Sequence, residues 1–416
     1  MTISPYGALK IRDYRLLLAG RLFVSVAVLI QAVAIGWQVY SLTKDPLSLG
    51  LIGLSEAFPA IGISLYAGHI NDIFDRKLIA LGAIAILIIS FASLSILSAG
   101  YIGMPILLIS IYCINALTGF ARGFYAPAVF AMISHLVPRE LYGNAAAWTS
   151  AFWQASSVIG PCSAGFLYVW LGTSKTYLMS TILLTIAFFI FLFIKADTKP
   201  SAKEDTNMIR NIREGLNFVF SNQIISGAMV LDLFAVLFGG AVALLPMFTA
   251  EVFHCGPQML GILRAAPSVG ALLTASFLAH RPIFKNAGLV LFTCVAGFGL
   301  CMILFGLSTN IYFSLFLLCL SGALDGISVW IRNTIFQLVT PHNMKGRVAA
   351  LNNMALQSSN EIGEFESGVA AKLMGLVPSV IFGGCATLII VLVTAFKTPK
   401  LRKLHLQHLY DINAKT

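Results

Sequence analysis

The sequence predicts an all-α integral membrane protein, with twelve transmembrane helices arranged as two pseudo-symmetric six-helix bundles. Three observations predict it: the composition, a series of apolar runs long enough to cross a bilayer, and a repeat that relates the two halves. Of the 416 residues, 58% are hydrophobic and 11% are charged, and the mean hydropathy is +0.87. Soluble domains carry about 25% charged residues. The composition therefore excludes a soluble enzyme, a disordered protein and a nucleic-acid binder, despite a net charge of +10.

Apolar runs separated by short polar breaks follow one another along the whole chain. A spanning helix needs about 20 apolar residues. A β-barrel would instead show short segments of alternating polarity, so unbroken runs favour helices. The predicted spans cover residues 16–40, 47–68, 78–98, 105–134, 144–170, 177–194, 224–249, 257–279, 288–307, 311–337, 348–375 and 379–396.

The Lys and Arg residues lie mostly on one side of these spans. They gather before the first span, after the last one and in alternate loops, whereas the other side holds only Lys44 and Lys175. Cytoplasmic loops carry such an excess of basic residues. The pattern predicts a multi-pass protein of the cytoplasmic (inner) membrane with both termini in the cytoplasm, and it accounts for the net charge without nucleic acid.

The longest polar segment divides the chain between the sixth and seventh spans. We predict an N-terminal six-helix bundle over residues 1–194, a cytoplasmic linker over 195–223, a C-terminal six-helix bundle over 224–396 and a cytoplasmic tail over 397–416.

The second half of the chain repeats motifs of the first. The pattern Gly-x5-Pro-x2-Gly of residues 53–62 recurs at 261–270, an offset of 208, and Pro-x4-Gly of residues 138–143 recurs at 341–346, an offset of 203. Many transporters are built from such repeats, with the substrate bound near the membrane midplane between them. The repeat predicts two bundles that alternate access to a central site.

Charged residues inside the spans are candidates for function, because each costs about 2.5–3.5 kcal/mol to insert at the bilayer centre. Arg122 and Asp325 occupy equivalent positions of the repeat near mid-bilayer, and so do Glu56 and Arg264. One half thus presents a cation where the other presents an anion, twice. Salt bridges between helices are the alternative explanation for Glu56, Arg264 and Glu366.

Four carboxylates are our candidates for proton coupling. Glu361 and Glu364 are three residues apart and share a helix face, where two carboxylates do not both ionise easily. Asp232 lies in the seventh span and Asp325 in the tenth.

Four further residues are our candidates for substrate binding. Arg122 and Arg332 would attract an anionic or catecholate-like substrate, and Arg332 shares the helix face of Asp325. The aromatic side chains of Tyr125 and Trp330 would line an apolar cavity, with packing as the alternative.

The loop after the second span resembles the signature loop of the major facilitator superfamily, Gly-x-x-x-Asp-Arg-x-Gly-Arg-Arg/Lys. Four residues fit the signature and two depart from it, since Ile73 replaces the first Arg and Asp75 replaces the second Gly. The resemblance implies a gating latch in which Asp72 meets a basic residue or a helix N-terminus. The fitting residues are Gly68, Asp72, Arg76 and Lys77.

The fifth span is similar to a Gly-Pro-x-x-Gly-Gly motif of proton-coupled exporters in this superfamily. Gly160 and Pro161 match it, and Ala164 replaces the first closing glycine. The resemblance implies a gating role for this helix, since Pro161 removes a helix hydrogen bond.

Three further segments, residues 231–240, 263–271 and 360–368, resemble the subfamily that includes the enterobactin exporter and related siderophore or drug exporters. This resemblance implies export of a small organic molecule driven by the proton gradient.

Together these observations predict a secondary active transporter that exports a siderophore by proton antiport with alternating access. Multidrug efflux, and uptake of an iron–siderophore complex or a lipid, are the alternatives, and a membrane-embedded enzyme is a remote one because no common catalytic signature occurs. We expect no cofactor or metal and no nucleic acid. The expected partners are a small-molecule substrate, protons and the lipid bilayer, and the expected state is a monomer.

Overall fold

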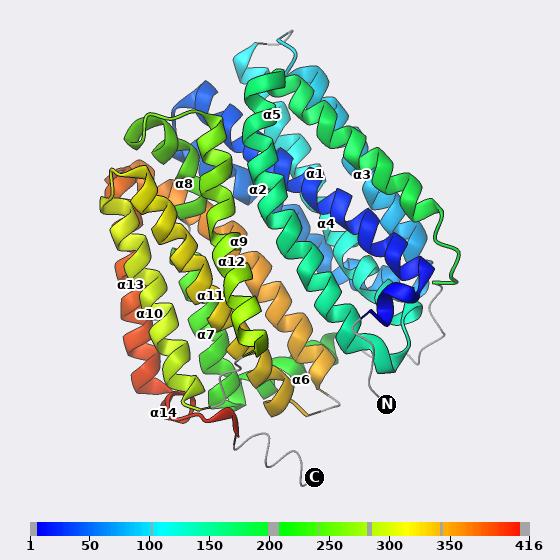
Figure 1. The fold of residues 1–416 in the computed structure, drawn as a ribbon, viewed down its shortest axis with the longest axis vertical. Helices are drawn as coiled ribbons and strands as arrows, with labels where there is room; N and C mark the ends of the chain where they lie inside the picture. The colour runs from blue at the N-terminus through cyan, green and yellow to red at the C-terminus, as the bar shows by residue number, and fades with distance from the viewer. Residues whose placement is uncertain are drawn as a thin grey trace. The chain divides into compact units, whose positions relative to one another are not determined.

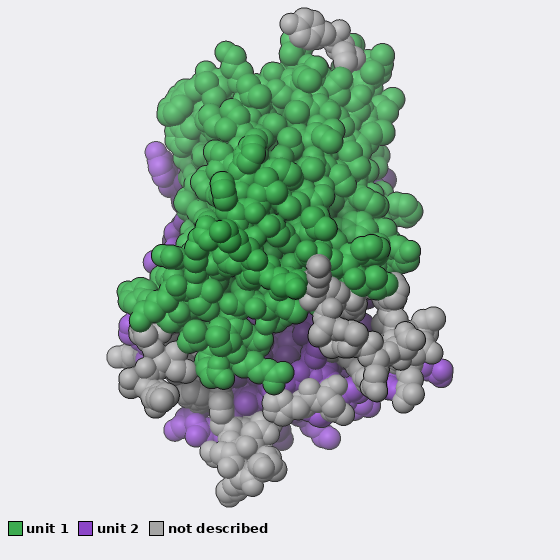
Figure 2. Space-filling model, turned by 90° about the vertical axis from the view of Figure 1, so that its right-hand side faces the viewer, with its two compact units in different colours: residues 1–203, 254–265 green, residues 204–253, 266–416 purple. Residues whose placement is uncertain are grey.

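The computed structural model describes residues 6–100, 103–198, 208–239, 241–280, 285–341 and 344–407, and within these ranges the long elements are all helices (Figure 1). The chain forms two compact units, which Figure 2 colours separately. Unit 1 comprises Met1–Lys203 and His254–Ala265, and unit 2 comprises Glu204–Phe253 and Ala266–Thr416.

Unit 1 is built from five long helices. Asp45 caps the second by accepting a hydrogen bond from the Ser48 N–H at 3.2 Å, and Asp75 caps the third by accepting from the Lys77 N–H at 3.0 Å. Acidic caps of this kind satisfy the free N–H groups of the first turn. The helices are α1 (Arg12–Thr43), α2 (Pro46–Ile73), α3 (Arg76–Leu97), α4 (Met104–Leu136) and α5 (Tyr142–Leu192).

Helix α5 holds both the fifth and the sixth predicted spans. It is interrupted at Gly172, which has φ 79° and ψ 173°, and its two parts run in opposite directions (Figure 1). Gly375 has nearly the same conformation, φ 94° and ψ 164°, between α12 (Lys345–Met374) and α13 (Leu376–Lys397). Glycine adopts positive φ without a steric penalty. The two glycines are 203 residues apart, so the same turn closes both copies of the repeat.

Unit 2 contains most of the second half of the chain. Its helices, besides α12 and α13, are α6 (Met208–Ser221), α7 (Gln223–Phe238), α8 (Ala241–Met247), α10 (Ala287–Leu307), α11 (Ile311–Val339) and α14 (Pro399–Arg402). A π-helical turn at Phe248–Val252 follows α8. Helix α9 (Pro257–His280) begins in unit 1 and continues in unit 2.

The seventh predicted span, residues 224–249, is divided rather than continuous. Helix α7 ends at Phe238, Gly239 leaves the helical conformation, and α8 begins at Ala241. Glycine is among the weakest helix formers, and Gly240, which follows Gly239 in the sequence, lies outside the described residues.

Ten helices of the described residues are long and apolar enough to cross a membrane, which confirms a multi-pass membrane protein. One of the ten, Arg139–Leu192, contains two predicted spans, and α12 is not among them. Helix α12 is 30 residues long but carries Glu361, Glu364 and Glu366, which lower its hydropathy. The count of twelve spans stays a prediction.

Candidate transport site

Helices α2 and α4 approach closely in unit 1. A Cβ added to Gly119 would lie 2.1 Å from the backbone oxygen of Glu56, and one added to Gly123 would lie 2.4 Å from Cγ2 of Ile63. Small residues at such spacing let two backbones come close in membrane proteins. The crossing brings the side chain of Glu56 beside α4.

At this crossing Arg122 of α4 forms an ion pair and a hydrogen bond with Glu56 of α2. The Arg122 side chain is 41% exposed and that of Glu56 is 16% exposed. Arg122, a predicted substrate residue, therefore has a carboxylate partner but also an accessible edge.

A buried amide network links α4 to α2 and to α1. Asn115 of α4 donates to the backbone oxygen of Ile52 at 2.9 Å and to Oγ of Ser55 at 3.1 Å. Gln31 of α1 donates to Oδ1 of Asn115 at 3.4 Å. This network was not predicted from the sequence, although amide side chains inside apolar runs indicate one, because buried polar groups need partners.

Unit 2 holds a second charged group, on α7 and α11. Nη1 of Arg332 lies 2.5 Å from Oδ1 of Asp232, and both side chains are nearly fully buried, with 5% and 4% exposed. The contact is an ion pair without the angles of a good hydrogen bond. Nη2 of Arg332 lies 3.7 Å from Oδ1 of Asp325, whose side chain is 48% exposed. Within the described residues the group holds two carboxylates and one guanidinium.

The helix crossing of unit 1 recurs in unit 2 between α9 and α11. A Cβ added to Gly322 would lie 1.9 Å from the backbone oxygen of Pro267, and one on Gly326 would lie 3.3 Å from Cα of Ala271. Gly123 meets Ile63 in unit 1, and the repeat offsets of 203 and 208 carry that pair onto Gly326 and Ala271. The crossing is therefore a repeated feature.

The predicted gating residues of α5 pack against the start of α9 within unit 1. A Cβ on Gly261 would lie 2.3 Å from the backbone oxygen of Pro161. Arg264 donates from Nη1 to the backbone oxygen of Ala32 at 3.2 Å, and Gly160 approaches Leu29 of α1.

The signature loop connects α2 to α3. Lys77 donates from Nζ to the backbone oxygens of Leu192 at 2.9 Å and Ile194 at 2.6 Å, so it caps the carbonyls at the end of α5. Arg76 donates from Nε to the backbone oxygen of Asn71 at 3.3 Å. Gly68 lies in α2 with open space where a Cβ would be. The side chain of Asp72 lies outside the described part of the structure.

The carboxylates of α12 lie on a helix that packs against α7. A Cβ on Gly363 would lie 2.7 Å from the backbone oxygen of Leu237. Glu361, Glu364 and Glu366 are all partly buried.

The two predicted aromatic residues pack in hydrophobic cores. Tyr125 is buried in unit 1, with its ring centroid 6.2 Å from that of Phe191, and its hydroxyl is buried too. Trp330 is partly buried against the core formed by α7, α10 and α11. Neither position favours the role of a cavity wall over that of packing.

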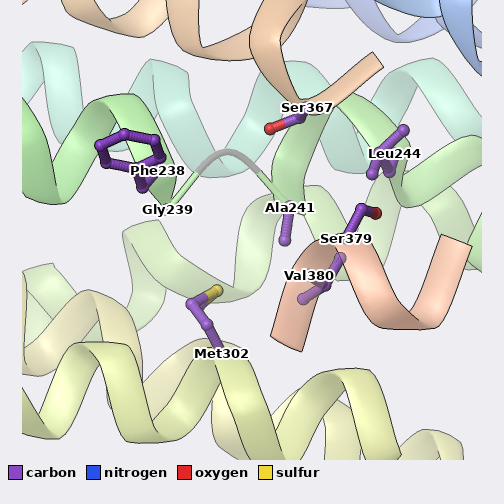
Figure 3. Close-up of a pocket in the computed structure, with 8 residues that line it drawn as sticks. All are labelled: Phe238, Gly239, Ala241, Leu244, Met302, Ser367, Ser379 and Val380. Carbon is purple, nitrogen blue, oxygen red and sulfur yellow. The ribbon is translucent and has the colours of Figure 1, made fainter. Parts of the chain in front are cut away.

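A small pocket opens at the break between α7 and α8 (Figure 3). Its cavity volume is about 10 Å³, about the space that a single water molecule needs, so the pocket is too small for a drug-sized ligand. Its lining comes from α7, α8, α10, α12, α13 and the break itself: Phe238, Gly239, Ala241, Leu244, Met302, Ser367, Ser379 and Val380.

Long apolar helices, a repeated helix crossing and ion pairs in the middle of membrane helices define a membrane transporter built from two related halves. The chain belongs to the transmembrane secretion effector family of the major facilitator superfamily, whose sequence profile matches residues 3–414.

Known relatives and solved structures agree with this assignment. The enterobactin exporter EntS of Citrobacter koseri is 26% identical over 386 residues, covering 92% of this chain and 91% of the relative, and EntS of Escherichia coli O1:K1 matches to the same extent. The D-xylose–proton symporter superposes with a TM-score of 0.72 at 14% identity, covering 96% of this chain and 100% of that one. A mutant of the nucleoside transporter NupG superposes with a TM-score of 0.71 at 12% identity, covering 92% of this chain and 99% of that one. At these identities the structures show the fold alone.

Proposed function

We propose that this protein exports a small organic anion, a siderophore, across the cytoplasmic membrane in exchange for protons, with both termini in the cytoplasm. Its assignment to a family of secretion effectors supports export. The match to enterobactin exporters over 92% of the chain supports a siderophore as the substrate class.

The observation that carries proton coupling is the second carboxylate beside Arg332. The guanidinium is already paired with Asp232 at 2.5 Å, so Asp325, at 3.7 Å and 48% exposed, has only an incomplete counter-charge. An ionised carboxylate is costly at membrane depth, and binding a proton removes that cost. Asp325 is therefore the proposed proton-loading group, and the buried Asp232 is its fixed neighbour.

The observation that supports an anionic substrate is the exposed edge of Arg122. Its ion pair with Glu56 holds the guanidinium in place on α4, and Arg side chains bind planar oxygen pairs through two parallel hydrogen bonds. A catecholate or carboxylate on the substrate would compete with Glu56 for this guanidinium.

Measuring the siderophore on both sides of the membrane tests the proposed function. Cells that carry this gene are starved of iron, the gene is deleted, and the siderophore is quantified by mass spectrometry in cells and spent medium. Loss from the medium with accumulation inside, restored by the wild-type gene but not by Asp325→Asn, is the expected result.

Two other results would contradict the proposal. Unchanged amounts of siderophore in the cells and in the medium would contradict siderophore export. Increased drug sensitivity of the same strain would then favour multidrug efflux. A strain that exports normally but cannot use added iron–siderophore complex would favour uptake.

A further inference from the structure

The end of unit 2 carries a compact basic segment, residues 398–406, which we call the C-terminal strap. It follows α13 and contains α14. Leu401 and Leu406 are fully buried, and Leu404 is buried as well. These leucines pack into the core that α7, α10 and α11 form, so the strap is part of the folded unit.

Close backbone contacts hold the strap against α10 and α7. The Gly288 N–H donates to the backbone oxygen of Leu404 at 3.2 Å, and the Asn286 N–H donates to Nδ1 of His405 at 3.2 Å. A Cβ on Gly288 would lie 1.8 Å from the backbone oxygen of Leu401, and one on Gly227 of α7 would lie 2.9 Å from Cγ2 of Thr398. These contacts hold the backbone of the strap in place, so its outward side chains extend from fixed positions.

Those outward side chains are basic. Lys400, Arg402 and Lys403 of the strap are exposed, as are Lys397 at the end of α13 and Lys285, which precedes the contact residue Asn286. The sequence contains no Asp or Glu from residue 367 to residue 410, or from residue 252 to residue 324. The surface thus gathers five cations, with no carboxylate in the segments that form it.

The surface begins where the apolar face of α13 ends. Leu392, Val393 and Phe396 are exposed on the last turns of α13, at spacings that place them on one side of the helix, and Lys397 follows directly. Exposed apolar residues of this kind face lipid tails, so the adjoining basic residues lie at the level of the headgroups.

We propose that the strap, together with Lys285 and Lys397, binds the phosphate headgroups of anionic phospholipids in the cytoplasmic leaflet. Basic clusters next to a membrane span attract anionic lipids, with each Lys or Arg contributing to the affinity. The strap contacts both α7, which carries Asp232, and α10, so a bound headgroup rests on the same folded core as the candidate transport site.

Native mass spectrometry of the full-length protein in detergent, titrated with phosphatidylglycerol and with neutral phosphatidylcholine, tests this proposal. We expect preferential binding of phosphatidylglycerol that weakens as salt rises. The triple variant K400Q/R402Q/K403Q should bind it on the order of tenfold to a hundredfold more weakly, with phosphatidylcholine binding unchanged.

A control variant, K44Q/K175Q, removes two exposed basic residues from the predicted outer side of the membrane and should keep wild-type binding. An equal loss in this variant, or equal binding of the two lipids by the wild type, would overturn the proposal. If the strap triple variant does not fold, K400R/K403R preserves the charge and must keep the lipid preference. A free phosphate site predicts competition by millimolar inorganic phosphate, which a headgroup site at the membrane level does not.

Discussion

Arg332 is the residue on which the charged group of unit 2 depends most, because it lies between two carboxylates and is almost fully buried. Its two contacts are unequal: Asp232 is close and buried, whereas Asp325 is farther away and half exposed. Because of this asymmetry, we expect Asp232 and Asp325 to have different roles, although both lie in apolar helices.

Asp325→Asn should abolish proton-coupled transport while the protein still inserts and folds. Asparagine keeps the size of the side chain but cannot exchange a proton, and the ion pair of Arg332 with Asp232 remains. Uptake of labelled substrate into inverted proteoliposomes with an imposed pH gradient would measure it. Asp45→Asn is the control, since asparagine also caps helices well, and equal transport by both variants would remove Asp325 from the mechanism.

Arg332→Ala should destabilise the protein by about 3–5 kcal/mol, because it leaves Asp232 buried without its counter-charge. The double variant D232N/R332A should regain much of that stability. Thermal unfolding in detergent measures both. If single and double variants of the buried pair unfold alike, the pair does not stabilise unit 2.

The variant Arg122→Ala should cost less stability, because the pair of Arg122 with Glu56 is partly exposed. It should also weaken transport of an anionic substrate.

At the scale of the elements, the feature that positions both charged groups is the glycine crossing. α4 meets α2 at Gly119 and Gly123, and α11 meets α9 at Gly322 and Gly326. The backbones approach so closely that a methyl group does not fit at Gly119 or Gly322, where the neighbour is a backbone oxygen.

Gly119→Ala and Gly322→Ala should each destabilise the protein by about 1–3 kcal/mol, the usual cost of overpacking. Gly82→Ala in α3 is the matched control, because no atom lies within 4 Å of its added Cβ and alanine favours a helix by about 1 kcal/mol. Unfolding temperatures of the three variants give the comparison. If Gly82→Ala lowered the unfolding temperature as much as Gly119→Ala, the close helix crossing would not be the cause of the destabilisation.

The sequence predicted the positions of the helices better than it predicted which charged residues pair. Apolar runs located the helices because hydropathy is a local property, and the repeat identified Arg122 and Asp325 as equivalent. The pairing of Arg122 with Glu56, and of Arg332 with Asp232, depends on helix rotation and crossing, which no local pattern contains. The break at Gly239 was missed because glycine also occurs inside helices. The burial of Leu401, Leu404 and Leu406 was missed because leucines between lysines show no clear apolar pattern.

At the scale of the whole molecule, the orientation in the membrane stays a prediction that fusions can test. Both termini should face the cytoplasm, since most basic residues flank the spans on that side. Alkaline phosphatase fused to either end should be inactive, and fused after Gly100, in a predicted outer loop, it should be active. Activity at one terminus alone would require an odd number of spans.

The chain passes through unit 1 twice, because His254–Ala265 belongs to that unit although unit 2 surrounds it in sequence. A gene cut after Lys203 would therefore yield a first fragment that lacks twelve residues of its own folded body, among them Gly261, whose backbone meets Pro161. Neither fragment should be stable when synthesised alone, and activity should return only when both are made in the same cell. The two repeats are in this sense not separable proteins.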